Sequence, residues 1–246
     1  MFRLPLRQTE GLIGSVIQLL GLDLAVPDHS TLSRRAETLA VVRPPSNAEP
    51  IHLLVDSTGL KLCGAGEWLV EKHGASRRRS WRKLHIGVDA GSGQIVAAAL
   101  TTNDVDDGTQ VGALLDQIDG PIASFTADGA YDQDGVYGEI AERHPYAAVI
   151  VPPRSSAVPS KTAETAPTQR DRHLQLIAER GRMGWQKASG YNLRALVEAD
   201  IGRWKRVIGE ALRSQTDARQ ATDVAIAVDV LNRMLELGRP NYVRII

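Results

Sequence analysis

Apolar residues recur at helical spacing near the start of the chain. Residues 8–20 place apolar side chains three and four positions apart, and Gly21 ends this run, so the spacing predicts an amphipathic helix. A second, shorter helix is predicted through the sequence LSRRAETL, with Ser30 or Thr31 as its cap. Helix, turn and helix together are compatible with a DNA-reading unit, which would expose Arg34 and Arg35, and equally with an ordinary helical hairpin.

Short apolar runs separated by turn residues follow a segment, VVRPPSNAEP, that has the composition of a linker. Three such runs come first: IHLLVDST, WRKLHIGVDA and QIVAAALTT. The glycine-rich turn at 91–93 predicts a hairpin, so these three strands are expected to be antiparallel neighbours. A helix at 108–118, a strand in SFTADGAY, a helix at 135–143 and a strand in YAAVIVPP complete the order βββαβαβ.

The rest of the chain is predicted to be helical. Residues 154–168, rich in Ser, Pro, Thr and Ala, are expected to form a flexible excursion. Helices are predicted near 169–183, 192–213 and 221–237, the last ended by Gly238 and Pro240. The predicted fold class is therefore α/β, with a mixed sheet followed by helices. We expect a small helical region at 1–42 and a larger domain at 50–246.

Composition narrows the functional classes. Hydrophobic residues make up 43% and charged residues 24% of the 246 residues, as in ordinary globular proteins. No run is long and apolar enough to span a membrane, and the single Cys63 excludes an intramolecular disulfide, so a cytoplasmic protein is expected.

The net charge of zero conceals a segregation of charge along the chain. Residues 86–142 hold eleven acidic residues and no Lys or Arg, whereas residues 71–85 hold six Lys and Arg and residues 169–219 hold eleven. Such a pattern suits a metal-dependent enzyme that acts on a polyanion. It suits a solvated acidic surface between basic loops equally well.

Two carboxylates stand where strands are predicted to end. Asp56 follows the apolar run of the first strand, and Asp128 follows the fourth strand directly before a glycine. An Asp before a Gly is also typical of an ordinary turn. Asp132 is the alternative to Asp128.

A third carboxylate lies on a predicted helix. Tyr191, Arg194, Glu198 and Lys205 fall on one face of that helix, beside a separate apolar stripe. A solvated ion pair between Arg194 and Glu198 is the alternative interpretation.

The pattern Tyr191-x2-Arg194-x3-Glu198-x6-Lys205 resembles the Tyr-Arg-Glu-Lys signature of bacterial insertion-sequence DDE transposases, in the group of insertion-sequence-four and insertion-sequence-five elements. The blocks VDSTGLK, WRKLHIGVD and ADGAYD, and the N-terminal LPLRQTEGLI and STLSRR, resemble other blocks of this family. The resemblance covers nearly the whole chain. Family members usually have further residues ahead of the first block, so an N-terminal truncation is expected.

The resemblance implies a ribonuclease-H-like fold and a metal-dependent DNA strand-cleavage and strand-transfer activity. Asp56, Asp128 and Glu198 would be the catalytic residues and would hold two Mg²⁺ ions, with Mn²⁺ able to substitute. Tyr191, Arg194 and Lys205 would contact DNA, as would Arg34 and Arg35. The expected partners are double-stranded DNA, as terminal inverted repeats and target, and a second copy of the chain. The alternatives are an inactive DNA-binding remnant of a transposase and a host nuclease of the same fold.

Overall fold

The computed structural model describes residues 4–36, 49–62, 81–214 and 216–238. Its first two helices are α1 (Leu6–Leu19) and α2 (His29–Arg35). The carboxylate of Asp28 accepts hydrogen bonds from the backbone N–H groups of Ser30 and Thr31, so Asp28, and not the predicted Ser30 or Thr31, caps α2.

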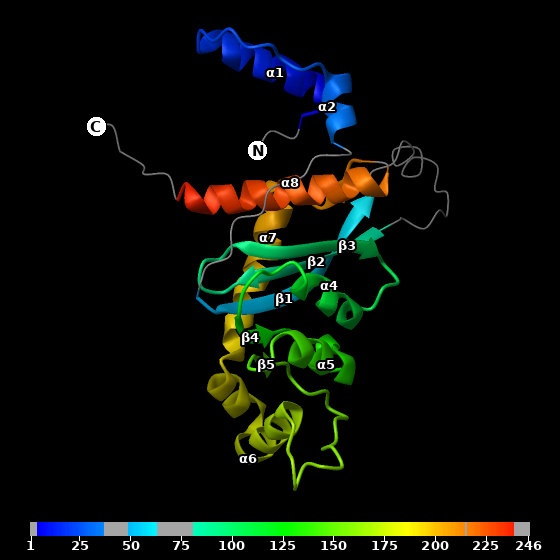
Figure 1. Ribbon diagram of the computed structural model, residues 1–246, viewed down its shortest axis with the longest axis vertical. Coiled ribbons are helices and arrows are strands. Elements are labelled where there is room, and N and C mark those ends of the chain that lie inside the picture. Colours follow the sequence, from blue (N-terminus) through cyan, green and yellow to red (C-terminus); the bar gives the residue numbers. More distant parts are fainter. Residues whose placement is uncertain (1–3, 37–48, 63–80, 215, 239–246) are drawn as a thin grey trace, which may run out of the picture.

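The helices α1 and α2 form a pair that stands apart from the sheet (Figure 1), and no residue in either helix is buried. Two helices at the predicted positions are confirmed. The end of the predicted N-terminal region, residues 37–42, and most of the predicted linker lie outside the described residues.

In the described part of the chain, six strands form one mixed sheet. They are β1 (Ile51–Leu62), β2 (Trp81–Asp89), β3 (Ile95–Thr102), β4 (Ile122–Thr126), β5 (Ala148–Ile150) and β6 (Ala211–Leu212). The order is β3-β2-β1-β4-β5, with β6 paired to the far end of β1. β1, β2 and β3 are antiparallel, whereas β4, β5 and β6 join in parallel. The predicted hairpin and the predicted order of strands are confirmed.

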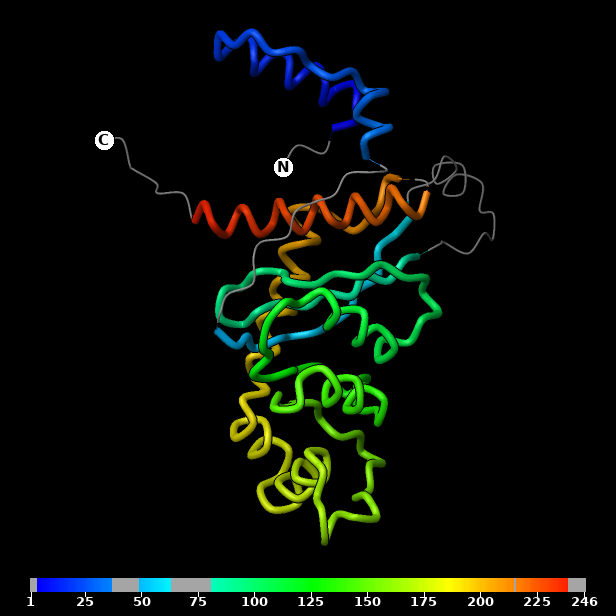
Figure 2. Tube along the Cα trace, viewed as in Figure 1, coloured from blue at the N-terminus to red at the C-terminus, as the bar shows by residue number. Residues whose placement is uncertain are grey.

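Helices connect and follow the strands, as Figure 2 traces along the chain. They are η1 (Asp107–Gln110), α4 (Val111–Leu115), η2 (Gly129–Tyr131), α5 (Asp134–Arg143), α6 (Gln169–Ser189), η3 (Tyr191–Arg194), α7 (Ala195–Val207) and α8 (Asp217–Glu236), where η marks a 3-10 helix. The prediction of one helix over 192–213 is wrong at its end. Gly209 takes a positive φ of 109°, which ends the helix, and the chain then pairs with β1 as β6.

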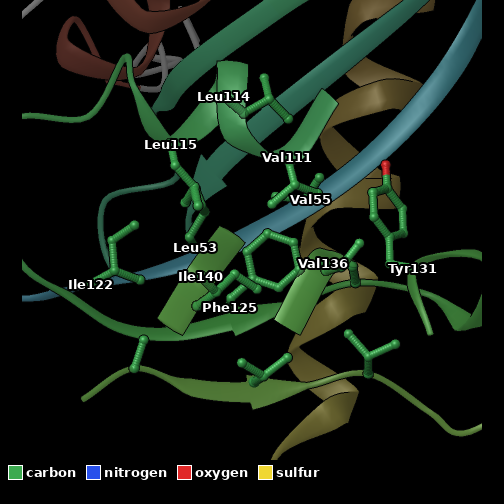
Figure 3. Packing of buried hydrophobic residues seen from close by; sticks show 14 of the residues in the cluster. Leu53, Val55, Val111, Leu114, Leu115, Ile122, Phe125, Tyr131, Val136 and Ile140 are labelled. Atoms are coloured by element: carbon green, nitrogen blue, oxygen red, sulfur yellow. The ribbon is translucent and has the colours of Figure 1, made fainter. Parts of the chain in front are cut away.

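The two faces of the sheet carry separate hydrophobic layers. One layer joins β1, β4 and β5 to α4 and α5, and Figure 3 shows Phe125 of β4 surrounded by side chains of β1, α4 and α5. The other layer joins β1, β2 and β3 to α7 and α8, with Trp204 of α7 fully buried. The sheet is therefore covered on both faces, which fits the apolar runs of its central strands.

A buried amide fixes α8 against the edge strand β3. The Asn232 side chain accepts a hydrogen bond from Ile95 N at 2.9 Å and donates one to Ile95 O at 2.9 Å. Both polar groups of the amide are thus satisfied inside the apolar layer.

The segment 154–168 contains no helix or strand, as expected, but hydrogen bonds attach it to the rest of the fold. Its first residue, Arg154, donates to Gly129 O and Ala130 O, and its Ser160 donates through both N and Oγ to the carboxylate of Asp171 on α6. These bonds bind the segment to η2 and to α6. Among the described helices, none is both long and apolar enough to cross a membrane.

Candidate active site

Among the described residues, no strand pairs with one edge of β1 in the middle of its length. β4 pairs with β1 only at Ile51–Leu54, and β6 pairs only at Lys61–Leu62. Asp56 lies in the interval between these two pairings. Asp56 was expected at the end of the first strand, but β1 continues to Leu62 because β2 pairs with it as far as Lys61. The candidate site is thus an interruption of the sheet between β4 and β6, next to the continuous strand β1.

The register of the parallel pair places Asp128 near Asp56. Leu54 pairs with Thr126, the last residue of β4, and Asp128 follows two residues later, as Asp56 follows Leu54. Asp128 then leaves the strand direction, because its side chain caps η2 by accepting from Ala130 N at 2.8 Å. Asp56, in the middle of β1, and Asp128, just past the end of the neighbouring β4, therefore reach the same interruption of the sheet.

Arg194 joins the two aspartates to Glu198. Its Nη2 lies 3.0 Å from Asp56 Oδ2 and 3.7 Å from Asp128 Oδ2, and its Nη1 pairs with Glu198 Oε1. Arg194 is the last residue of η3, and Glu198 lies in the first turn of α7. The structure therefore brings the three predicted carboxylates around one guanidinium group.

The site concentrates negative charge in a partly buried place. Burial raises the pKa of Asp56 above its usual range, and the charges of Asp128 and Glu198 raise it further against the lowering effects of Ser57 N–H and Arg194. Burial also raises the pKa of the Tyr191 hydroxyl. Like charges this close repel, so a cation among them lowers the electrostatic cost of the cluster. In this arrangement Arg194 is that cation.

The remaining predicted residues lie at different distances from the cluster. Tyr191 begins η3, three residues before Arg194. Lys205 is exposed on α7, about 10 Å along the helix from Glu198 at 1.5 Å per residue. Arg34 and Arg35 lie in the last turn of α2, in the helical pair that stands apart from the sheet.

Asp132, the alternative second carboxylate, lies in a different environment. Its buried side chain accepts from Arg170 Nε at 2.7 Å, from Arg170 Nη2 at 3.1 Å and from Arg154 N at 2.9 Å. Burial alone would raise the pKa of Asp132, but these donors hold it below its usual value. This carboxylate is fully engaged in joining α6 to the segment after β4.

The cluster has the donor chemistry of a magnesium site. Its three side chains offer only carboxylate oxygens, the ligands that Mg²⁺ and Mn²⁺ prefer. As they stand, no three Asp, Glu, His or Cys side chains of the described residues are arranged to hold one ion. Arg194 lies among the carboxylates and takes the charge-neutralising position. The residues fit a divalent cation in charge and ligand type once Arg194 gives way.

Sequence reasoning missed the residues that support this cluster. Arg154 and Arg170 fix the segment after Asp128. Trp185 of α6 packs against Tyr191 and donates a hydrogen bond to His173 of the same helix. Their contacts join residues far apart in sequence, so no periodicity reveals them. One local sign is Gly181, a glycine inside an otherwise helical pattern, which marks a break in α6.

Two family models match this chain. Residues 47–233 match a family model described as the transposase DDE domain, and residues 1–65 match a second model with the same description. Among solved structures, the chain is similar to a piggyBac transposase in a cryo-EM synaptic complex with hairpin DNA, at 12% identity and a TM-score of 0.32.

That match covers 80% of this chain and 55% of the piggyBac chain, so the chain spans about half the length of that transposase. The first family model covers far more than half of this chain and includes Asp56, Asp128, Arg194 and Glu198. This chain belongs to the family of transposase DDE domains.

Proposed function

We propose that the chain is a transposase that cleaves DNA strands at the ends of an insertion sequence and joins them to target DNA, with the help of divalent metal ions. One observation carries this proposal: Asp56, Asp128 and Glu198 come from β1, from the end of β4 and from α7, and all three contact Arg194. Family membership supports transposition as the context of this chemistry.

The proposal includes a ribonuclease-H-like fold. Its support is the sheet order β3-β2-β1-β4-β5, with three antiparallel strands followed by two parallel ones and helices on both faces. In this arrangement one carboxylate stands on the central strand, one just beyond the adjacent parallel strand and one on a following helix. That placement supports the interruption beside β1 as the proposed site of chemistry.

The three carboxylates would bind the metal ions from two sides of the site. Asp56 and Asp128 would bind metal from the sheet side, and Glu198 would bind from α7. Two divalent ions bound there would supply activation of the attacking oxygen and charge stabilisation at the leaving 3′-oxygen. Cleavage forms a bond from a water oxygen to phosphorus and breaks the bond from phosphorus to the 3′-oxygen, whereas in strand transfer the attacking oxygen is a 3′-hydroxyl.

Tyr191, Arg194 and Lys205 would contact the DNA backbone. Arg194 lies at the carboxylates, so once it gives way to metal its guanidinium is placed to contact the phosphate that reacts. Lys205 is exposed on the same face of α7, about two turns beyond Glu198, and would contact a neighbouring phosphate. Two copies of the chain, one on each transposon end, are the proposed assembly.

The test uses labelled DNA with and without the terminal inverted repeats that flank the coding sequence, in the presence of Mg²⁺. We expect cutting at the repeat ends only. Indiscriminate cutting would identify a nuclease of the same fold, and binding without cutting would identify an inactive remnant.

Glu198→Gln separates catalysis from binding in the same assay. We expect it to abolish cleavage and to leave DNA binding within about threefold of the wild type, because the change removes one charge and no volume. Glu139→Gln is the matched control, since Glu139 also pairs with an arginine four residues away, on the distant helix α5. Cleavage by Glu198→Gln at the rate of the control would remove Glu198 from the site.

A further inference from the structure

The helix α6 is broken at Gly181, whose φ of 69° and ψ of 170° are not helical. The second segment therefore does not continue along the axis of the first. Residues twelve apart in a continuous helix are separated by about 18 Å. The break instead brings Trp185 of the second segment against His173 of the first, with ring centroids 5.6 Å apart and the rings perpendicular.

The hydrogen bonds of His173 determine its protonation state. Trp185 Nε1 lies 2.9 Å from His173 Nδ1, and His173 Nε2 lies 2.7 Å from the carbonyl oxygen of Val149 on β5. An indole N–H only donates and a carbonyl oxygen only accepts. The imidazole must therefore accept at Nδ1 and donate at Nε2, which only the neutral form with its proton on Nε2 can do.

Trp185 connects His173 to Tyr191, the first residue of η3. It is 1% exposed, and its ring lies 5.2 Å from the ring of Tyr191. Gly190, with a φ of 75°, turns the chain between them, and Leu193 N donates to Gly190 O at 3.0 Å to close η3. Arg194 follows at the end of the same short helix.

We propose that His173 and Trp185 are positioning residues, which hold Tyr191 and with it Arg194 in register with the carboxylates. The contacts run from Val149 on β5 through His173, Trp185 and Tyr191 to η3, and we call this chain of contacts the relay. Its first member belongs to the strand that pairs with β4, just before Asp128. The inference rests on the proposed function, because the register matters only if the carboxylates do chemistry.

The relay requires a neutral imidazole, so acid should interrupt it. A proton on Nδ1 would face the indole N–H, and two donors cannot bond to each other. Burial lowers the pKa of His173, while its bond to Val149 and the charge of Asp132 act in the opposite direction. Asp132 is itself paired with Arg170, a neighbour of His173 on α6.

The first measurement is hydrogen exchange of the backbone amides of residues 190–194, without DNA or metal. Trp185→Phe keeps an aromatic ring beneath Tyr191 and removes the N–H donor, whereas His173→Leu removes both bonds of the imidazole. We expect exchange in this segment to accelerate by about tenfold in each variant, because local opening becomes easier. Trp81→Phe, on β2, is the control and should leave these amides unchanged. Unchanged exchange in Trp185→Phe and His173→Leu overturns the relay.

The second measurement is cleavage of labelled transposon ends. We expect Trp185→Phe to lower kcat by about tenfold to a hundredfold with KM changed by less than about threefold, since misplacement of the site affects the chemical step. His173→Gln keeps a donor and an acceptor and should restore most of the rate lost in His173→Leu. The wild-type rate should also fall in acid, at a pH below the ordinary histidine pKa of about 6.5 because burial lowers the pKa of His173, and this fall should be absent in His173→Gln.

The outcomes distinguish the relay from the proposed function. Accelerated exchange together with a wild-type cleavage rate in Trp185→Phe overturns the positioning role and leaves the transposase proposal standing. A wild-type protein that cuts no DNA overturns the proposed function, and the positioning role with it, whatever the exchange result.

Discussion

The substitution Arg194→Ala tests whether Arg194 acts as the internal counter-ion of the carboxylate cluster. It removes a positive charge that contacts Asp56, Asp128 and Glu198 together, the only such charge in the described part of the chain. At 3.0 Å and an effective dielectric constant of about 20, the attraction between Arg194 and Asp56 is about 5 kcal/mol before desolvation is subtracted.

The net effect on stability is smaller than this attraction. Loss of one partner from a well-buried ion pair costs about 3–5 kcal/mol. The Arg194 and Asp56 side chains are 17% and 14% exposed, whereas Asp128 and Glu198 are 38% and 56% exposed and contribute little. We therefore expect a loss of about 2–3 kcal/mol without metal, which for a chain of 246 residues lowers Tm by about 4–12 °C.

Thermal unfolding with and without Mg²⁺ measures the effect. Mg²⁺ at 100 times its Kd stabilises a folded protein by about 2.7 kcal/mol, and we expect a larger gain in Arg194→Ala because the ion meets no competing guanidinium. Arg143→Ala is the matched control, since Arg143 pairs with two exposed carboxylates on α4 and α5. A Tm loss in Arg194→Ala no greater than in Arg143→Ala, or equal Mg²⁺ gains in both, would refute the reasoning.

Three further substitutions test the framework around the site. Asn232→Leu should cost about 2–4 kcal/mol in urea unfolding, because it leaves both backbone groups of Ile95 without partners in a buried layer; a loss below 1 kcal/mol would contradict this. Trp204→Ala should cost about 3–5 kcal/mol and destabilise the protein without changing the DNA site, so near-wild-type stability would show that the layer under α7 is loosely packed. Asp132→Asn should lower the free energy of unfolding above about pH 4. The difference from the wild type should shrink in acid, because the wild type loses its ion pair with Arg170 as the pH falls through the lowered pKa of Asp132. A difference that does not depend on pH would show that Arg170 contributes through packing alone.

Local patterns of the sequence suffice for most of the fold. Apolar runs and turn residues predict the order of strands and helices from β1 to β5, and the glycines at 91–93 predict the hairpin between β2 and β3. These features depend on neighbouring residues only. Tertiary pairing decides the rest: β1 extends past Asp56 because β2 accompanies it, and α7 ends early because residues 211–212 pair with β1.

The site could be predicted only in part, because local spacing and the family resemblance indicate its residues but not their tertiary contacts. Spacing on one helix joins Arg194 to Glu198, and the family resemblance adds Asp56 and Asp128. Spacing does not indicate that one guanidinium touches all three carboxylates, since this depends on the register of β1 with β4. Nor does it indicate the contact of His173 with Trp185, which exists only because α6 breaks at Gly181.

The most direct measurement of the central claim is anomalous scattering from crystals of the protein grown with Mn²⁺ and a transposon-end DNA. The account predicts manganese peaks within about 2.5 Å of carboxylate oxygens of Asp56, Asp128 and Glu198, with Arg194 displaced from its position between them. Manganese bound elsewhere, with Arg194 still paired to all three carboxylates in the presence of DNA, would contradict it.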